Sequence, residues 1–142
     1  MNAGEVREQF DGHPWHGNSL RATLGGIAEE LAFAHPVPNG RSIAELLAHM
    51  SAWVGIVERR LRGEEVAITP ELDFPPVDGR KWGDLVSGFE AAYAALLLTV
   101  ERTEDWSAQV PGKRYTKEYM LRGLLHHDTY HAAQIAMLRK FG

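Results

Sequence analysis

The most informative segment of this chain is His126-His127-Asp128-Thr129-Tyr130-His131-Ala132-Ala133-Gln134-Ile135. Its histidines His127 and His131 are four residues apart, which places both imidazoles on one face of a helix, as in many metal sites. Apolar residues recur at helical spacing on the same side, and this indicates a face that packs toward the core. These residues are Met120, Leu124, Ile135 and Leu138. We therefore expect both imidazoles to point inward.

A third histidine, His49, lies in another segment with helical periodicity, Ser42-Ile43-Ala44-Glu45-Leu46-Leu47-Ala48-His49-Met50-Ser51-Ala52-Trp53. Helical spacing groups it with Leu46 and Trp53, so it should also face the interior. Buried histidines are often only hydrogen-bonded core residues, and such a cluster is the alternative. Two helices that each bury histidine can, however, converge on one ion. The sequence thus predicts a divalent metal held by His49, His127 and His131.

Composition narrows the class of protein. The chain has 142 residues, of which 44% are hydrophobic and 24% charged, and its formal net charge is −4. These values suit a single domain over residues 1–142 and disfavour a nucleic-acid partner, because no basic stripe is present. There are no cysteines, so disulfides, thiolate ligands and a cysteine nucleophile are excluded. The amino terminus lacks an apolar segment and no stretch approaches a membrane span, so we expect a cytoplasmic protein without a membrane partner.

The periodicity predicts four long helices and no strands, and hence an all-α four-helix bundle. The second helix starts at a capping box made by Ser42 and Glu45, in which each side chain bonds the other residue's backbone amide. Prolines at positions 36 and 38 end the first helix. The expected ranges are about Asn18 to Ala34, Ser42 to about Arg62, about Trp82 to Arg102, and from after Thr116 almost to the carboxyl terminus.

The connection between the second and third helices is long. Gly63 to Lys81 contains Pro70, Pro75, Pro76 and Gly79, which is too rich in helix breakers for a further helix. It is long enough to cross the length of the bundle. We therefore predict a crossover, after which the second and third helices run parallel.

Three segments resemble the DinB/YfiT-like family of small four-helix metalloproteins: Pro14-Trp15-His16-Gly17, Ile43-Ala44-Glu45-Leu46-Leu47-Ala48-His49 followed by Trp53, and His127 through Ile135. The resemblance spans nearly the whole chain and implies the same fold. It also implies that His49, His127 and His131 bind a divalent metal, as the matching histidines do in the family. Ala133 departs from the glycine common there but removes no ligand. Family members include thiol-dependent S-transferases, a mycothiol-dependent isomerase and proteins of unassigned activity.

Three neutral imidazoles suit Zn²⁺, Ni²⁺ or Fe²⁺ and leave a coordination position open. A low-molecular-weight thiol could occupy this position and become a nucleophilic thiolate, or a water could be acidified for hydrolysis. The first interpretation, a thiol-dependent S-transferase that acts on a small molecule, agrees best with the family resemblance. A metal-dependent hydrolase is the neighbouring alternative. The third is a non-catalytic metal-binding bundle that acts through association, for example as a homodimer.

Other residues are candidates for supporting roles. Gln134, three residues after His131, could orient an imidazole, and so could Glu45, one turn before His49, although its capping box already gives it a role. Trp15 and His16 are candidates for the mouth of the site. Asp128 occupies the position of the glutamate in the H-E-x-x-H motif of zinc proteases. Aspartate is shorter and the third histidine lies far upstream, so a metalloprotease is disfavoured.

Overall fold

The computed structural model describes residues 2–142, and every regular element in this part of the chain is helical, which confirms the all-α class. The only strand-like feature among these residues is an isolated bridge between Gln109 and Thr116. The helices are α1 (Ala3–Asp11), α2 (Leu20–Leu24), α3 (Glu29–Phe33), α4 (Ile43–Leu61), α5 (Pro70–Asp73), α6 (Trp82–Arg102) and α7 (Lys117–Leu138), followed by the 3₁₀ turn η1 (Arg139–Phe141).

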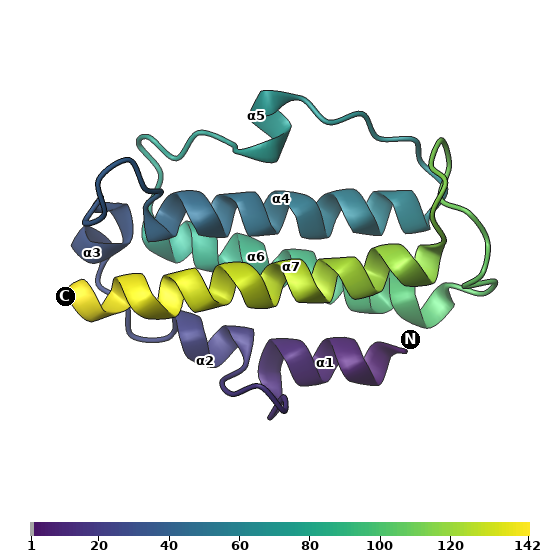
Figure 1. Cartoon of the computed structure of the whole chain (residues 1–142), viewed down its shortest axis with the longest axis horizontal. Helices are drawn as coiled ribbons and strands as arrows, with labels where there is room; N and C mark the ends of the chain where they lie inside the picture. Colours follow the sequence, from purple (N-terminus) through teal and green to yellow (C-terminus); the bar gives the residue numbers. More distant parts are fainter. Residues whose placement is uncertain (1) are drawn as a thin grey trace.

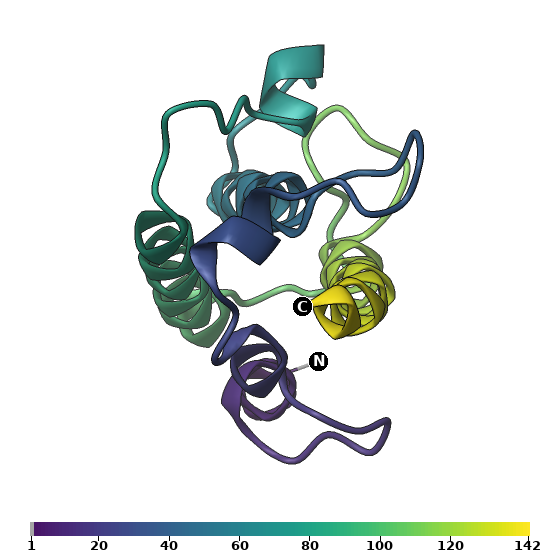
Figure 2. The same ribbon diagram turned by 90° about the vertical axis from the view of Figure 1, so that its left-hand side faces the viewer.

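The three long helices lie side by side, with α4 packed against both α6 and α7 (Figure 1). The shorter α1 and α2 follow one another below them, where α1 contacts α6 and α2 contacts α7. Figure 2, seen along the helices, shows α4, α6, α7 and the α1–α2 pair arranged around a shared centre. Side chains from all of them fill that centre, and the largest fully buried ones include Tyr93, Phe89, Leu47, Leu121 and Ile135.

The three helices expected from Ser42 onward are confirmed. Ser42 caps α4 through the predicted box: its hydroxyl accepts from the Glu45 amide at 3.1 Å, and its own amide donates to the Glu45 carboxylate at 3.0 Å. The third predicted helix agrees with α6 at both ends. The side chain of Thr116 caps α7, as expected for a helix that begins after it.

The prediction of one helix from Asn18 to Ala34 is wrong. Ser19 caps α2, which ends before Gly25, and α3 does not begin until Glu29. Gly26 between them has a φ of +74°, a left-handed conformation that interrupts a helix and that glycine adopts without steric cost. The apolar periodicity continues through this break, which explains the error.

Helix α1 was not predicted. It begins with a capping box in which Asn2 accepts from the Glu5 amide and Glu5 accepts from the Asn2 amide. Val6 and Phe10, one turn apart, are buried on its inner face. Both signals were present in the sequence, but a nine-residue helix offers too few turns for a clear period.

Residues 63–81 contain one short helix, α5, which the sequence did not predict. The hydroxyl of Thr69 caps it, and Pro70 occupies its first turn, where a missing N–H carries no penalty. In Figure 1 this segment runs back along α4, so that α4 and α6 begin at the same end of the molecule. It thereby carries Asp73 and Phe74 over the middle of α4, beside His49.

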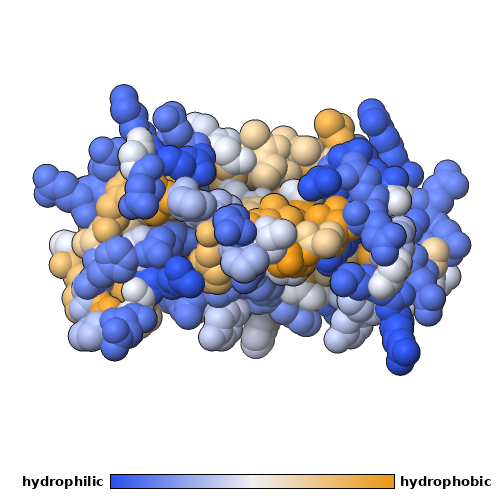
Figure 3. All heavy atoms as spheres, turned by 90° about the horizontal axis from the view of Figure 1, so that it is seen from above, coloured by the Kyte–Doolittle hydropathy of each residue, from blue (hydrophilic) through white to orange (hydrophobic). Residues whose placement is uncertain are grey.

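By length and composition α6 could cross a membrane, and it is the only such helix in the part of the chain that is described. That observation is weak, because the core helix of a globular protein passes the same test. One stripe of α6 packs into the core through Leu85, Phe89, Tyr93 and Leu96. Figure 3 shows the face that carries α5, on which hydrophobic side chains gather in the middle between hydrophilic ends.

Candidate metal centre

The structure brings His49, His127 and His131 together, although 78 positions separate the first two. Each offers one ring nitrogen, and the three nitrogens lie within 4.8 Å of one another. Nε2 of His49 is 3.0 Å from Nε2 of His127. His49 on α4 is buried, whereas the two histidines of α7 are half-buried. The expectation of inward-facing imidazoles therefore holds fully for His49 alone, and the other two line an accessible edge of the cluster.

The Nδ1 atom of each imidazole faces a protein oxygen. For His49 this is the carbonyl of Asp73, at 2.6 Å. For His131 it is the side-chain oxygen of Gln134, at 2.6 Å, and for His127 it is the carboxylate of Asp128, at 3.3 Å. An acceptor at Nδ1 favours the tautomer in which this nitrogen carries the proton. Each Nε2 is then left with a free lone pair, which is the form of histidine that binds metals.

This arrangement leaves lone pairs facing one another. If Nδ1 carries the proton in both His49 and His127, neither Nε2 can donate to the other, and their 3.0 Å separation is repulsive without a cation. Zinc–nitrogen bonds of ~2.0–2.1 Å in tetrahedral geometry hold two ligand nitrogens roughly 3.3 Å apart. The observed separation is close to this value. The residues present therefore fit a divalent metal.

Electrostatics also favour neutral imidazoles. Burial lowers the pKa of His49, and the proximity of His127 and His131 lowers it further, against the opposing effect of the Asp73 carbonyl. Burial likewise lowers the pKa of His131, with the Gln134 hydrogen bond opposing it. Because a protonated imidazole cannot coordinate, a lowered pKa keeps these side chains in the metal-binding form near neutral pH.

Two buried polar residues, Asp128 and Tyr93, form a hydrogen-bonded chain that ends at Nδ1 of His127. Asp128 and Tyr93 are both completely buried, and the Tyr93 hydroxyl donates to one carboxylate oxygen of Asp128 while the other oxygen faces His127. Burial raises the pKa of Asp128, an effect that the bonds to His127 and Tyr93 partly offset. Helical periodicity groups Tyr93 with the other buried residues of α6 and predicts no more than a core position. Its role depends on which α7 residue it meets, and helical periodicity does not show this.

The segment around α5 supplies further contacts that the sequence did not predict. The ring of Phe74 stacks on His49, with centroids 4.0 Å apart and planes inclined by 7°. The indole N–H of Trp53 donates to the Asp73 carboxylate at 2.8 Å. Asp73 and Phe74 lie in a stretch without periodicity, so no local signal places them at the site.

Glu45 is engaged elsewhere. Besides capping α4, its carboxylate contacts Nε2 of His35 at 2.5 Å and the guanidinium of Arg41 at 3.2 Å. Burial alone would raise its pKa, but the hydrogen bonds from Ser42, His35 and Arg41 outweigh this effect and lower the pKa to about 2. No hydrogen bond or ion pair joins Glu45 to His49 within residues 2–142.

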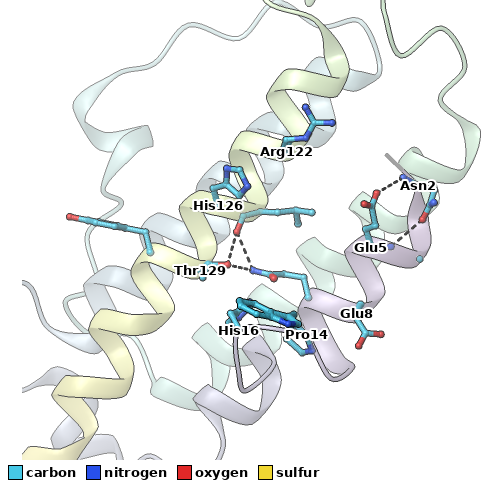
Figure 4. A pocket seen from close by; sticks show the side chains of 13 residues that line it. Asn2, Glu5, Glu8, Pro14, His16, Arg122, His126 and Thr129 are labelled. Atoms are coloured by element: carbon cyan, nitrogen blue, oxygen red, sulfur yellow. Dashed lines mark hydrogen bonds between the residues drawn. The ribbon is translucent and has the colours of Figure 1, made fainter.

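The two candidates for the site mouth, Trp15 and His16, line a different pocket. It lies between α1 and the side of α7 that carries His126 and Thr129 (Figure 4). Gln9 also lines it, and its side-chain amide donates to the Thr129 hydroxyl at 2.6 Å. The Trp15 side chain is fully exposed. None of the three clustered histidines lines this pocket.

A second hollow adjoins the histidine cluster directly. This hollow, the α4–α7 groove, has a volume of about 310 Å³. His49 and His127 form part of its lining, and the remainder is mostly apolar or aromatic, with Arg60 as the only basic side chain among its lining residues: Trp53, Val57, Arg60, Asp73, Tyr115, Tyr119, Met120, Gly123 and Leu124. A ligand in this groove would lie beside the Nε2 atoms of the cluster.

Comparison with known proteins agrees with this geometry. The family model described as the DinB superfamily matches residues 15–135, which include all three clustered histidines. No curated protein and no solved structure matches the chain. The match covers most of the sequence, and the residues that carry it fold into one helical assembly around the cluster. The chain therefore belongs to the DinB superfamily.

Proposed function

We propose that this protein is a metal-dependent enzyme, a thiol-dependent S-transferase that joins a small electrophilic substrate to a low-molecular-weight thiol. His49, His127 and His131 would hold the metal, which by the chemistry of three imidazoles is Zn²⁺, Ni²⁺ or Fe²⁺. The single observation that carries the proposal is the convergence of the three rings: each has Nδ1 against a protein oxygen, and one ring nitrogen of each lies within 4.8 Å of the others.

The chain's own residues would act by positioning. Asp128 and Gln134 fix the rings of His127 and His131, and the stacked ring of Phe74 closes one side of His49. When bound, the metal supplies Lewis acidity, which lowers the pKa of a thiol or a water at its open position. Trp53 and Leu124 line the adjoining groove with apolar surface, which excludes water and accepts an organic chain.

The groove favours a thiol over water as the nucleophile. Its lining is mostly apolar or aromatic, and the only acidic residue in it, Asp73, already accepts from the Trp53 indole. A hydrolase needs a group that takes a proton from the attacking water. One oxygen of the Asp73 carboxylate is already engaged by the Trp53 indole N–H. Metal-dependent hydrolysis is nevertheless the second candidate, since Asp73 lines the same groove as His49 and His127 and its carboxylate could accept a proton. A non-catalytic metal-binding bundle is the third.

We also propose an architecture, a cellular location and an assembly for this protein. We infer a single four-helix bundle in which α1 and α2 together take the place of the first helix and residues 63–81 form the crossover. We also propose a cytoplasmic protein that acts on small molecules, and its formal charge of −4 disfavours binding to nucleic acid or to an anionic membrane surface. A homodimer is the assembly we predict if the protein also acts through association.

The test uses protein purified without chelator or metal-affinity resin. Elemental analysis should find about one transition metal per chain. After replacement by Co²⁺, addition of glutathione, bacillithiol or mycothiol should produce a sulfur-to-cobalt charge-transfer band. If hydroxide and carboxylates perturb the cobalt spectrum but no thiol gives that band, hydrolysis replaces thiol transfer. A protein that binds neither zinc, nickel nor cobalt would overturn the metal site.

A further inference from the structure

Arg60 is a buried cation without an acidic partner. Its side chain is 3% exposed, and no aspartate or glutamate forms an ion pair with it anywhere between residues 2 and 142. One terminal nitrogen donates to the Tyr115 hydroxyl at 3.2 Å and the other to the Val66 carbonyl at 2.8 Å. Its Nε is buried and has no hydrogen-bond partner.

These two neutral oxygens do not balance the charge. A guanidinium carries more N–H donors than two acceptors satisfy, and it keeps its positive charge at every accessible pH. Burying a cation without a counter-charge is costly, and buried charges in proteins are usually paired. The Trp53 ring lies 5.8 Å from the guanidinium carbon, which is favourable but weak compensation. The residues around Arg60 therefore leave its charge without a carboxylate partner within residues 2–142.

The α4–α7 groove connects Arg60 to the histidine cluster. His49, Trp53 and Arg60 follow one another along one face of α4 and all line the groove. The Trp53 ring centre lies 6.1 Å from that of His127 and 5.8 Å from the guanidinium carbon of Arg60. The same indole ring is therefore a neighbour of both the cation and the candidate metal site. A small molecule could contact both.

We propose that Arg60 binds the carboxylate of the substrate or thiol, whose apolar chain lies along the α4–α7 groove and whose reactive end reaches the metal site. A carboxylate matches the planar fork of a guanidinium and forms paired hydrogen bonds with it. Apolar walls suit a short hydrocarbon chain, and a volume of about 310 Å³ limits the ligand to a small one. This inference rests on the proposed function, because it names the ligand class of the same site.

The competing explanation is structural. Arg60 joins α4 to Val66, just after this helix, and to Tyr115, just before α7, so it could serve only to tie these loops. A structural tie predicts loss of stability on mutation but no preference for carboxylate ligands. Binding measurements can therefore separate the two roles.

The experiment uses the cobalt-loaded protein and two thiols of equal length, mercaptohexanoate and mercaptohexanol, each with the sulfur at one chain end. Titration of the sulfur-to-cobalt band gives both affinities. The carboxylate should bind at least ~10-fold more tightly, as expected for a charge-assisted hydrogen-bonded pair. Arg60→Met should remove this preference, so that the two thiols bind with about equal affinity. The matched control is Arg59→Met, since Arg59 is exposed and paired with Glu64.

The outcomes separate this inference from the proposed function. Equal affinities in the wild type, or a preference that survives Arg60→Met, would overturn the role of Arg60 while the band itself still supports thiol binding. If no thiol gives a band, the proposed function fails, and calorimetry with hexanoate and hexanol on the metal-free protein still tests Arg60. If Arg60→Met does not fold, Arg60→Lys should bind mercaptohexanoate several-fold more weakly, and an unchanged preference would overturn the inference.

Gly123 offers an independent test of the groove. It lies in the wall formed by α7, and a Cβ atom built there meets no atom within 4 Å. Gly123→Leu should therefore project into the groove and obstruct it while leaving every histidine and Arg60 in the sequence. We expect weaker binding of mercaptohexanoate and unchanged binding of methanethiol. Unchanged affinity for both thiols would place the hydrocarbon chain outside the groove and overturn the proposal.

Discussion

Nδ1 of His49 lies 2.6 Å from the carbonyl oxygen of Asp73, so a backbone group of the segment between α4 and α6 sets the orientation of a candidate metal ligand. The same residue accepts the Trp53 indole N–H through its side chain, and its neighbour Phe74 stacks on the imidazole. The orientation of the His49 ring therefore depends on α4, which carries it, and on the short segment that contacts it through Asp73 and Phe74.

Replacement of Phe74 should show this dependence. Phe74→Ala removes the ring that stacks on His49 and loosens the segment that supplies the Asp73 carbonyl, so we expect metal affinity to fall roughly 10-fold, as for other residues that orient ligands. Competition with a chromophoric chelator measures the affinity. Phe141→Ala is the control, because Phe141 is exposed near the carboxyl terminus. An equal loss in both variants would contradict the specific role of Phe74.

Direct removal of a ligand should have a larger effect. His127→Ala leaves two imidazoles, and metal content after dialysis against buffer should fall from about one per chain to nearly none. His126→Ala provides a close control, since His126 is the preceding residue but is exposed and lines the pocket on the α1 side. Retention of the metal by His127→Ala would remove this histidine from the site.

Tyr93 should influence the metal without touching it. Tyr93→Phe leaves a buried carboxylate oxygen of Asp128 without its donor, at a cost of about 1–3 kcal/mol in unfolding free energy. Because the same carboxylate orients His127, zinc affinity should also fall by ~10-fold. Urea unfolding and zinc titration measure the two effects. Tyr119→Phe, at an exposed tyrosine, should change neither. A stability loss with unchanged zinc affinity would assign Tyr93 to the core alone.

The cap of α4 should give a pH dependence of stability. The pKa of Glu45 is lowered from 4.5 to about 2 in the folded protein, so its contribution is present above the ordinary value and is lost as the pH falls through the folded value. Between pH ~5 and pH ~2, wild type should therefore lose about 1–2 kcal/mol more unfolding free energy than Glu45→Gln. Urea titrations across this range measure the difference. Glu71→Gln, at an exposed position of α5, should follow the wild type.

Removal of the metal should destabilise the protein but not unfold it. The apolar core extends through α1, α2, α4, α6 and α7 and does not depend on the histidine cluster. A bound ion at 100 to 1,000 times its dissociation constant adds roughly 3–4 kcal/mol, so chelation should lower the melting temperature by several degrees while the helical circular dichroism persists. A random-coil spectrum in chelator at room temperature would make the metal structural and weaken the case for an enzyme.

The long helices and the three histidines could be predicted because both depend on local periodicity. Ser42 with Glu45, and His127 with His131, are signals within one or two turns. The break at Gly26 was missed because apolar spacing continues across it, and α1 was missed because it is short. Asp73, Phe74, Tyr93 and Arg60 acquire their roles only when distant segments meet, and a single sequence does not encode such distances in any local pattern.

The candidate metal site is formed by two core helices on one side and by a surface connection on the other. The three clustered histidines belong to α4 and α7, the helices that also build the core. Helix α5 buries none of its own side chains, and the site is contacted by its last residue, Asp73, and by Phe74, which follows it. Surface connections tolerate insertion and substitution far better than core helices do. In a chain built this way, evolution could exchange residues 63–81 to admit a new substrate while the histidine cluster stays intact, and a protein engineer could begin with the same nineteen positions.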